Sequence, residues 1–572
     1  MFPRSAKSIP INHQIRSALG ILRHVDAMTP AELMKAILLA PIDLLWNGGI
    51  GTYVKASSET NADAGDKAND AIRVNGTELR VRVVGEGGNL GCTQRGRIEF
   101  ALNGGRINTD FIDNSAGVDT SDREVNLKIL LDRVVVDGDL TEKQRNRVLA
   151  SMTDDVAELV LRDNYEQNIA LANAARNAPS LLHVHEQWMR QLESEGRLDR
   201  DLEALPTKAE VKRRLEQGGA LTQPELAVLM AYTKIVLAEE LLASDLPEDP
   251  YLLLDLVSYF PKAVRDGFST QVEEHPLRRE IIVTQVVGDL VNGAGMTYWP
   301  RLTGETGASA AELTRANFVA REIFGSLPLR QELTMYDNKI DAAVQTRMRV
   351  DMRTLVERAS RWLVTNRRPP LDSQATVDLF AEPVQATMLA LPELLVGREL
   401  AAYDARRTAL VGQGVPEDLA ARVASYDVAY ALLNVVDIAA RDGLKPQDVA
   451  RVHFALGERL GISVLQQRIV DLPRADQWQT MARAALRDDL HAVHAQLTAE
   501  VLATTSADED VTGRAEPTQM REEAVRRVGE WEAATGEVAD RAVETLGTIC
   551  ADDDTDLARV SVALRVVRGL LA

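Results

Sequence analysis

Residues 79–124 read LRVRVVGEGGNLGCTQRGRIEFALNGGRINTDFIDNSAGVDTSDRE, and this stretch decides the expected fold. It opens with a short β-branched run at 79–84, which predicts a strand that ends in a glycine-rich loop. Residues 93–103 predict a helix that stops at a glycine pair. Residues 106–112 predict another short strand, and a helix is expected from about Thr120. The order strand, loop, helix is typical of a parallel α/β sheet.

The same alternation extends towards the N-terminus. Thr29-Pro30-Ala31-Glu32 is a capping box with proline at the first helical position, so it predicts a helix. Residues 42–46 predict an apolar strand that ends at Asn47-Gly48-Gly49-Ile50-Gly51, and Asn75-Gly76 predicts a hairpin turn. Ligands of parallel sheets bind beyond the carboxyl ends of strands, so both glycine-rich loops are candidate binding loops. From about Thr141 onward the pattern is helical almost throughout.

Composition and charge exclude several classes of protein. The 572 residues are 45% hydrophobic and 26% charged, which excludes wholesale disorder. Only Cys92 and Cys550 are present, so a disulfide framework is excluded. A net charge of −20 argues against nucleic acid and against a membrane surface as partners. The sequence lacks a long apolar run and an apolar signal region, so we expect a cytoplasmic location.

Metal binding is not predicted from the histidine pairs. His183 and His185 are two residues apart, and such residues do not share a helix face. His491 and His494 could share one, but no third ligand is evident, and zinc sites need more than two protein ligands. These histidines are therefore interpreted as surface or core residues, and no metal is expected.

The local motifs leave two interpretations of the glycine-rich loops open. Neither is a G-x-x-x-x-G-K-[ST] motif or a complete G-x-G-x-x-G motif, so nucleotide contact and simple turn geometry are equally compatible with them. Further along, residues 109–124 predict a helix start, where backbone N–H groups favour anions. Ser121 could offer its hydroxyl to a carboxylate there. Alternatively, Asp119 or Thr120 is only the N-cap of the helix.

The spacing of these residues resembles a known family. Glutamate dehydrogenases carry an E-G-A-N loop at a strand end, a threonine at a helix start, a P-D pair and then N-A-G-G-V-x-x-S-x-x-E. The corresponding residues here are Glu86-Gly87-Gly88-Asn89, Thr93, Thr109-Asp110, Asn114, Gly117, Val118, Ser121 and Glu124. The chain departs from the pattern at Gly88, Thr109 and Ser115-Ala116.

Longer stretches resemble one branch of that family, the large NAD-specific glutamate dehydrogenases of bacteria. The resemblance covers essentially the whole chain, and these stretches are residues 2–10, 41–57, 83–131 and 221–232. It implies that the N-terminal part of the chain is α/β and corresponds to the C-terminal half of a Rossmann-like dinucleotide-binding domain. A long, mainly α-helical region would follow it. The implied domains are a partial dinucleotide-binding (catalytic) domain over 1–140 and a helical C-terminal region over 141–572.

The resemblance also implies roles for individual residues. The cofactor would be NAD, with Asn89 near the nicotinamide ribose and Asn114 beside the nicotinamide carboxamide. Ser121 would bind the γ-carboxylate of L-glutamate. The remaining implied cofactor residues are those of the two loops: Gly87 and Gly88, and, on the adenosine side, Gly48, Gly49 and Gly51.

The implied reaction is oxidative deamination of L-glutamate to 2-oxoglutarate and ammonia in a homo-oligomer. The catalytic lysines and aspartate of the family are expected upstream of Met1, and neither Lys7 nor Lys55 matches them. The chain is therefore expected to be a C-terminal portion of a larger enzyme and inactive alone. Two alternatives remain: a non-catalytic helical scaffold or regulatory module with a relic nucleotide-binding fold, and a related amino-acid dehydrogenase.

Overall fold

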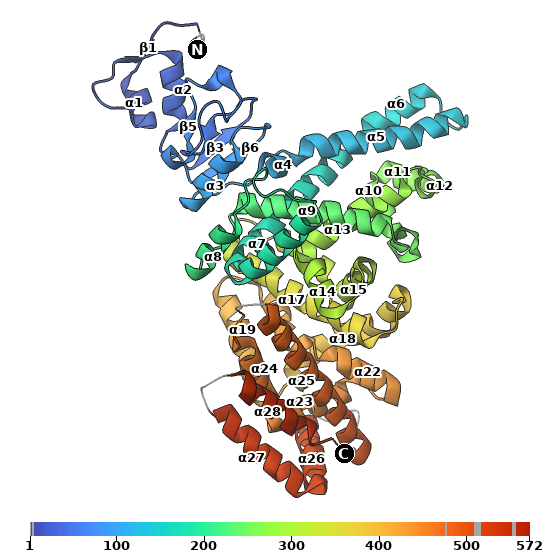
Figure 1. Cartoon of the computed structure of the whole chain (residues 1–572). Coiled ribbons are helices and arrows are strands. Elements are labelled where there is room, and N and C mark those ends of the chain that lie inside the picture. The colour runs from blue at the N-terminus through green and yellow to red at the C-terminus, as the bar shows by residue number, and fades with distance from the viewer. Residues whose placement is uncertain (1, 3–4, 475–476, 508–515, 552–555, 572) are drawn as a thin grey trace. The chain divides into compact units, whose positions relative to one another are not determined.

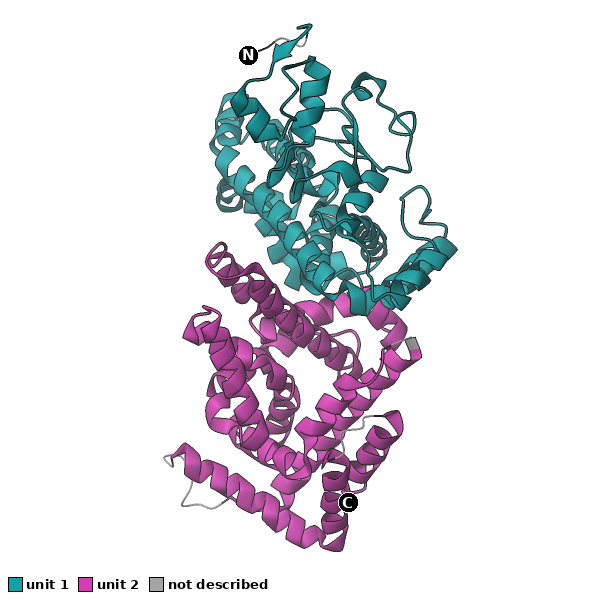
Figure 2. Cartoon of the chain, turned by 90° about the vertical axis from the view of Figure 1, so that its left-hand side faces the viewer, with its two compact units in different colours: residues 1–298 teal, residues 299–572 magenta. Residues whose placement is uncertain are grey.

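Helices dominate the computed structural model of the chain, which is 71% helical and only 3% strand. The structure describes residues 2, 5–474, 477–507, 516–551 and 556–571 (Figure 1). The chain divides into unit 1, residues 1–298, and unit 2, residues 299–572 (Figure 2). Each unit is described by itself below.

The prediction that the N-terminal part is α/β and forms the C-terminal half of a Rossmann-like domain is wrong. The described strands form three sheets of two strands each instead of one extended parallel sheet. The strand β1 (Ile9–Pro10) pairs with β2 (Ala27–Met28) in antiparallel orientation. The other two pairs are parallel: β3 (Leu44–Asn47) with β6 (Val83–Glu86), and β4 (Val54–Lys55) with β5 (Val74–Asn75).

Two segments account for most of the difference between the expected sheet and the observed strand pairs. The strand expected at 106–112 contributes only an isolated bridge between Arg106 and Val83, and α4 (Asp110–Asp113) begins within it. The hairpin expected at Asn75-Gly76 is a short 3₁₀ turn, Gly76–Glu78, because the Asn75 backbone N–H donates to the Glu78 carboxylate over 2.7 Å. The pleated surface is therefore too narrow to form a doubly wound sheet.

Locally capped helices occur where the sequence predicts them. The helix α2 (Pro30–Leu38) begins after Thr29, whose backbone N–H donates to Glu32 over 2.8 Å in a complete capping box. The helix α3 (Gln94–Leu102) begins after Thr93, whose hydroxyl accepts from the backbone N–H of Gly96. These contacts fix where both helices start relative to the strands that precede them.

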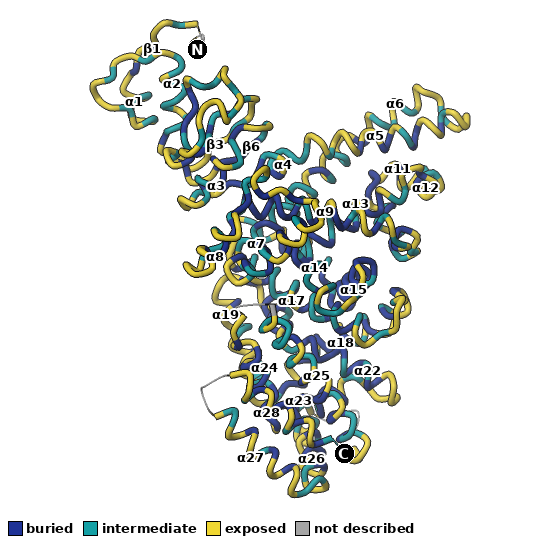
Figure 3. The backbone as a smooth tube through the Cα atoms, viewed as in Figure 1, coloured by how far each residue is buried: buried dark blue, intermediate teal, exposed yellow. Residues whose placement is uncertain are grey.

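Helices, three of them 20 residues or longer, make up the rest of unit 1. The helix α5 (Ser115–Val136) packs on α7 (Thr153–Ser194), and α7 is joined to α9 (Gln223–Leu242) by a Trp188–Thr233 hydrogen bond of 2.9 Å. Buried residues concentrate along α7, α9 and α13 (Arg278–Ala294) (Figure 3). The other described helices of this unit are α1 (His13–Leu19), α6 (Glu142–Ser151), α8 (Lys208–Glu216), α10 (Leu253–Tyr259), α11 (Lys262–Gly267), α12 (Ser269–Glu273) and α13 (Arg278–Ala294).

The described residues of unit 2 form helices joined by loops, and none of them forms a strand. One apolar core surrounds Phe380 and Leu433, and a second surrounds Leu497 and Trp531. Its elements are α14 (Tyr298–Thr306), α15 (Ala310–Ile323), α16 (Ser326–Thr334), α17 (Ala342–Asn366), α18 (Ser373–Leu394), α19 (Gly397–Gly412), α20 (Glu417–Ala424), α21 (Tyr426–Ala429), α22 (Leu432–Asp442), α23 (Pro446–Leu460), α24 (Ile462–Asp471), α25 (Gln477–Thr504), α26 (Pro517–Thr535), α27 (Glu537–Ala551) and α28 (Leu557–Arg568).

Among the described helices, no single one is long and apolar enough to cross a membrane. Two bent pairs, residues 373–412 and 417–442, reach the required length and composition only when their helices are taken together.

Candidate functional site

The two predicted glycine loops meet at one edge of the β3–β6 pair. Asn47 and Glu86 lie opposite each other at the carboxyl ends of these parallel strands. A Cβ atom added at Gly88 would lie 2.8 Å from the carbonyl oxygen of Gly49, so the loops approach each other too closely for a larger residue. Gly48 and Gly49 are exposed to solvent. The structure therefore brings together loops that are about forty residues apart in the sequence.

A buried ion pair holds the second loop. The Glu86 side chain is fully buried, and its carboxylate accepts hydrogen bonds from Arg97 Nε over 2.6 Å and from Arg97 Nη2 over 2.9 Å. Arg97 also pairs with Asp110 over 3.2 Å, and Asp110 accepts from the backbone N–H of Leu90 over 2.8 Å. Burial raises the pKa of the Glu86 carboxyl, although the hydrogen bonds from Arg97 oppose this effect. Sequence reasoning did not identify this pair.

The two asparagines predicted to contact the cofactor lie side by side. The Asn114 amide Nδ2 donates to Asn89 Oδ1 over 3.0 Å. Asn114 is the residue between α4 and α5, and Asn89 belongs to the loop after β6. Both are at least partly exposed, so solutes can reach their remaining amide atoms. The structure thus joins two polar side chains from separate motifs at the strand ends.

The start of α5 differs from the sequence expectation. The helix begins at Ser115, so Ser121 is its seventh residue and lies beyond the first turn. Neither Asp119 nor Thr120 is the N-cap, because that position is occupied by Asn114. Asn114 makes no capping hydrogen bond through its side-chain oxygen, and its amide nitrogen donates to Asn89.

Asn114 and Ser121 nevertheless share one face of α5. They are separated by seven residues, or about two helical turns. Ser121 is exposed, and so is Val118 between them, with 75% of its surface accessible. The opposite face carries Arg123 and Leu127, which are buried against the rest of unit 1. A solvent-facing stripe therefore extends from the asparagine pair to Ser121.

A buried charged cluster supports that stripe from behind, and sequence reasoning missed it. Arg123 pairs with Asp119 over 3.1 Å and with Asp163 of α7 over 2.5 Å. Its guanidinium also donates to the carbonyl oxygen of Tyr259 over 2.7 Å. Burial and the Asp163 carboxylate raise the pKa of Asp119 to about 6, although Arg123 opposes this shift. Burial lowers the pKa of Lys234 on α9 to about 8.

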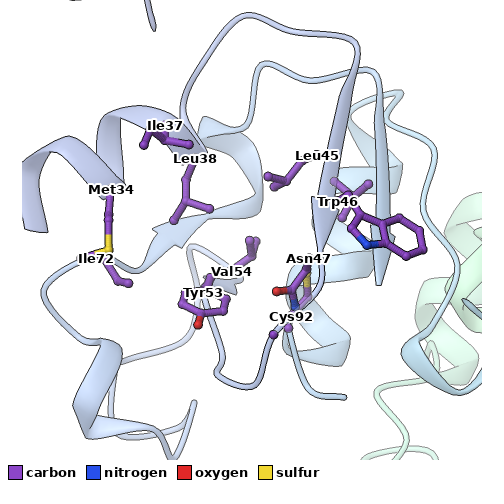
Figure 4. Close-up of a pocket in the computed structure, with 13 residues that line it drawn as sticks. Met34, Ile37, Leu38, Leu45, Trp46, Asn47, Tyr53, Val54, Ile72 and Cys92 are labelled. Carbon is purple, nitrogen blue, oxygen red and sulfur yellow. The ribbon is translucent and has the colours of Figure 1, made fainter. Parts of the chain in front are cut away.

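An apolar pocket of about 230 Å³ lies beside the first glycine loop. Figure 4 shows Met34 and Leu38 of α2 on one side of it and Trp46 and Asn47 of β3 on the other. The Asn47 Nδ2 atom is buried and has no hydrogen-bond partner among the described residues. Buried amide donors are normally satisfied, so this atom is available to donate to a polar atom placed in the pocket. The sequence placed Asn47 in a candidate binding loop but gave this residue no role of its own.

The described residues contain no group of three or more side chains that could hold a metal ion. His183 and His185 lie on α7, and His491 and His494 lie on α25. The rings of His494 and His453 stack with their centroids 3.7 Å apart, and burial lowers the pKa of both.

Two family models match the chain. The first, described as bacterial NAD-glutamate dehydrogenase, catalytic domain, covers residues 1–174. The second, described as glutamate dehydrogenase, C-terminal, covers residues 218–569. The loops, the asparagine pair and Ser121 all fall within the first match, whereas unit 2 falls largely within the second.

Curated relatives match over nearly the entire chain. An NAD-specific glutamate dehydrogenase from Mycobacterium tuberculosis is 43% identical, covering 100% of this chain and 34% of the relative. One from Halomonas elongata is 44% identical, covering 90% of this chain and 32% of the relative. One from Pseudomonas aeruginosa is 42% identical, covering 100% and 34%. The chain therefore spans about a third of the length of these relatives.

Proposed function

We propose, from the premise that this chain belongs to the NAD-specific glutamate dehydrogenase family of bacteria, that it forms part of a larger enzyme for oxidative deamination of L-glutamate. In that reaction glutamate, NAD⁺ and water give 2-oxoglutarate, ammonium, NADH and a proton. The cofactor, when bound, accepts the hydride from Cα of glutamate. The observation that carries the proposal is the hydrogen bond between Asn89 and Asn114 at the meeting point of the loops.

The asparagine pair suits the nicotinamide end of NAD. Its internal hydrogen bond uses Asn114 Nδ2 and Asn89 Oδ1. Asn114 Oδ1 can then accept from the carboxamide N–H, and Asn89 Nδ2 can donate to a ribose hydroxyl. Each amide is fixed in orientation by the other, so little rotamer freedom is lost on binding.

The first loop and its pocket suit the adenosine end of the cofactor. Gly48 and Gly49 leave the loop without side chains where it meets Gly88, and Gly51 has φ of +129°, a conformation that favours glycine. Gly87 packs against the Trp46 indole, where an added Cβ would lie 2.5 Å from the ring. The unpartnered Asn47 Nδ2 beside the pocket supplies a donor for a cofactor oxygen.

Ser121 suits the substrate. It lies about 10 Å along α5 from Asn114, because each residue of a helix advances by about 1.5 Å. A hydroxyl on the same solvent-facing stripe as the asparagine pair can donate to a carboxylate of glutamate while the amides hold the nicotinamide. In this assignment the two ends of α5's exposed stripe bind two different ligands.

The lysines and the aspartate that carry proton transfer in the family are assigned to another part of the larger enzyme. Cytoplasmic location and homo-oligomeric assembly stay predictions from the sequence. The role of this chain is then to position the nicotinamide against Cα of glutamate, which is the geometric requirement for hydride transfer.

The test is steady-state kinetics of the larger enzyme with glutamate and NAD varied separately. Ser121→Ala should raise KM for glutamate roughly 10- to 100-fold, since a hydrogen bond to a charged group contributes about 1.5–3 kcal/mol. Asn114→Ala should instead raise KM for NAD. Thr120→Ala, next to Ser121, is the matched control and should change neither constant, because its hydroxyl donates to Ala116 within the helix.

Equal losses towards both ligands, together with a lower melting temperature, would contradict the assignment and favour a purely structural role for α5. Unchanged kinetics in both variants would favour the non-catalytic module. A normal response to NAD with turnover of a different amino acid would favour a related dehydrogenase.

A further inference from the structure

Two asparagines of α7 support the junction between α4 and α5, which carries Asn114. Asn164 and Asn168 are about one helical turn apart, so they share a face of α7. The Asn164 amide donates through Nδ2 to the carbonyl oxygen of Ile112 over 2.8 Å and to Ser115 Oγ over 2.9 Å. These two partners lie on either side of Asn114, one in α4 and the other at the start of α5. A single amide group therefore holds both sides of the junction.

Contacts from outside α4 and α5 help to orient this junction. The helix α4 has only four residues, and the last carbonyl oxygens of a helix have no partner within it. Asn114 occupies the N-cap of α5 but makes no capping hydrogen bond through its side chain. Its amide nitrogen donates to Asn89 over 3.0 Å. Since Asn164 bonds to both helices at once, it fixes the direction in which Asn114 faces.

A second series of hydrogen bonds links α7 to the loop that carries Asn89. Asn108 Nδ2 donates to Asn168 Oδ1 over 2.7 Å and to Asp113 Oδ1 over 2.9 Å. The other carboxylate oxygen of Asp113 accepts from the backbone N–H of Glu86 over 3.0 Å. Glu86 is the last residue of β6 and lies three residues before Asn89. The same face of α7 is thus connected to both members of the asparagine pair, so a junction that moves relative to α7 also moves relative to Asn89.

Different contacts hold the part of α5 that carries Ser121. The buried side chain of Arg123, two residues further along, pairs with Asp163 of α7 over 2.5 Å. This ion pair does not use the Asn164 amide, although the two α7 residues are neighbours in the sequence. Removing the Asn164 amide should therefore disturb Asn114 while Ser121 keeps its place.

We propose that Asn164 is a positioning residue, which orients Asn114 for the nicotinamide of NAD. This inference rests on the proposed function, in which the asparagine pair holds the nicotinamide end of the cofactor. A junction that is fixed before NAD binds loses less conformational freedom on binding than a mobile one, so it binds the cofactor more tightly. Asn164 acts through Asn114, so its loss should weaken the binding of NAD and leave the binding of glutamate unchanged.

Steady-state kinetics of the larger enzyme, with NAD and glutamate varied separately, tests the proposal. Asn164→Ala should raise KM for NAD roughly 5- to 50-fold, since two neutral hydrogen bonds to the junction are lost. KM for glutamate should change by less than about twofold, because the ion pair beside Ser121 remains. A merely structural role predicts a different pattern: part of the enzyme unfolds, so kcat per chain falls while both Michaelis constants stay unchanged.

Further variants separate positioning from simple stabilisation. Ser115→Ala removes one acceptor of Asn164 and places a good helix former at the start of α5, so it should raise KM for NAD roughly 2- to 10-fold without loss of the fold. In the Asn114→Ala background, Asn164→Ala should add less than about twofold to KM for NAD, because it has nothing left to position. Gln167→Ala is the matched control and should change neither constant, because the Gln167 amide donates to the carbonyl oxygen of Asp163 within α7, over 3.5 Å.

Two results would overturn this proposal while the proposed function stands. In the first, Asn114→Ala raises KM for NAD, whereas Asn164→Ala lowers only kcat or matches Gln167→Ala. In the second, Asn164→Ala raises KM for NAD by the same factor in the parent and in Asn114→Ala, so it acts independently of that residue. Where Asn164→Ala yields no folded enzyme, Ser115→Ala takes its place in both comparisons. If Asn114→Ala itself leaves KM for NAD unchanged, the proposed function fails, and the positioning role fails with it.

Discussion

Replacing Arg97 by methionine removes the cation that neutralises Glu86 at the carboxyl end of β6. The Glu86 side chain has 0% exposure and Arg97 has 5%, so water cannot take the place of the guanidinium. The carboxylate would keep only the Cys92 backbone N–H, which donates over 3.1 Å. Loss of one partner of such a buried pair costs about 3–5 kcal/mol. The loop that carries Asn89 should therefore open far more often.

Hydrogen exchange of the full chain measures this opening locally. Peptides that cover residues 83–103 should exchange at least roughly 100-fold faster in Arg97→Met, since each 1.4 kcal/mol or so is tenfold. Peptides of unit 2 should be unchanged. Burial already raises the pKa of Glu86, and without Arg97 it rises further. A raised carboxyl pKa in the folded state means that stability falls as the pH rises through it, so the defect should grow with pH.

The matched control is Arg82→Met. Arg82 pairs with Asp43 over 3.6 Å, but their side chains are 83% and 88% exposed, so the pair contributes at most about 1 kcal/mol. Adding Glu86→Gln to Arg97→Met should recover part of the lost protection, because a neutral amide is less costly to bury. Equal exchange in Arg97→Met and Arg82→Met would refute the view that the buried pair holds the loop.

Three further changes test other parts of unit 1. Asp119→Asn should remove a pH dependence of stability. The pKa of Asp119 is raised from 3.8 to about 6, so the stabilisation that its protonated form gives is lost as the pH rises through that window. The Tm of the variant, measured relative to that of the parent, should therefore rise from about pH 4 to pH 7. Glu225→Ala should cost about 3 kcal/mol, measured by exchange at the start of α9, because Glu225 has 1% exposure and pairs with Arg214 over 2.8 Å. Gly91→Ala should lower the stability of its loop by about 1–3 kcal/mol in the same assay, since the added Cβ would lie 1.8 Å from Asn47 Nδ2. A stability equal to that of the parent chain would contradict the expectation for Glu225→Ala or for Gly91→Ala.

Local interactions were predictable from the sequence, whereas long-range pairing was not. Thr29 and Thr93 cap their helices through contacts three residues away, and such contacts depend only on local order. Residues 106–112 contain apolar and β-branched side chains, so they read as a strand. In the structure Asp110 instead contacts Leu90 and Arg97, and a helix begins there. The competing contacts come from residues that no local pattern identifies.

The candidate site shows the same division. The family resemblance singled out Asn89 and Asn114, but only the structure shows that their amides are hydrogen-bonded. The helix α5 begins about five residues before the start expected at Thr120, because Asn114 occupies the N-cap although Asp119 and Thr120 are also good N-cap residues. Asp163 lies on α7, 40 residues beyond Arg123 in the sequence, so its ion pair with that arginine of α5 could not be predicted.

In the proposed function, Asn114 and Asn89 hold the nicotinamide of NAD while Ser121 binds glutamate on the same face of α5. The most direct measurement is an experimental structure of the larger enzyme with NAD and 2-oxoglutarate bound. We expect Asn114 Oδ1 to lie within hydrogen-bond distance, about 2.7–3.2 Å, of the carboxamide nitrogen, and Ser121 Oγ to lie within the same distance of a 2-oxoglutarate carboxylate. A nicotinamide bound away from the β3 and β6 strand ends, with the Asn89–Asn114 pair facing only solvent, would contradict it.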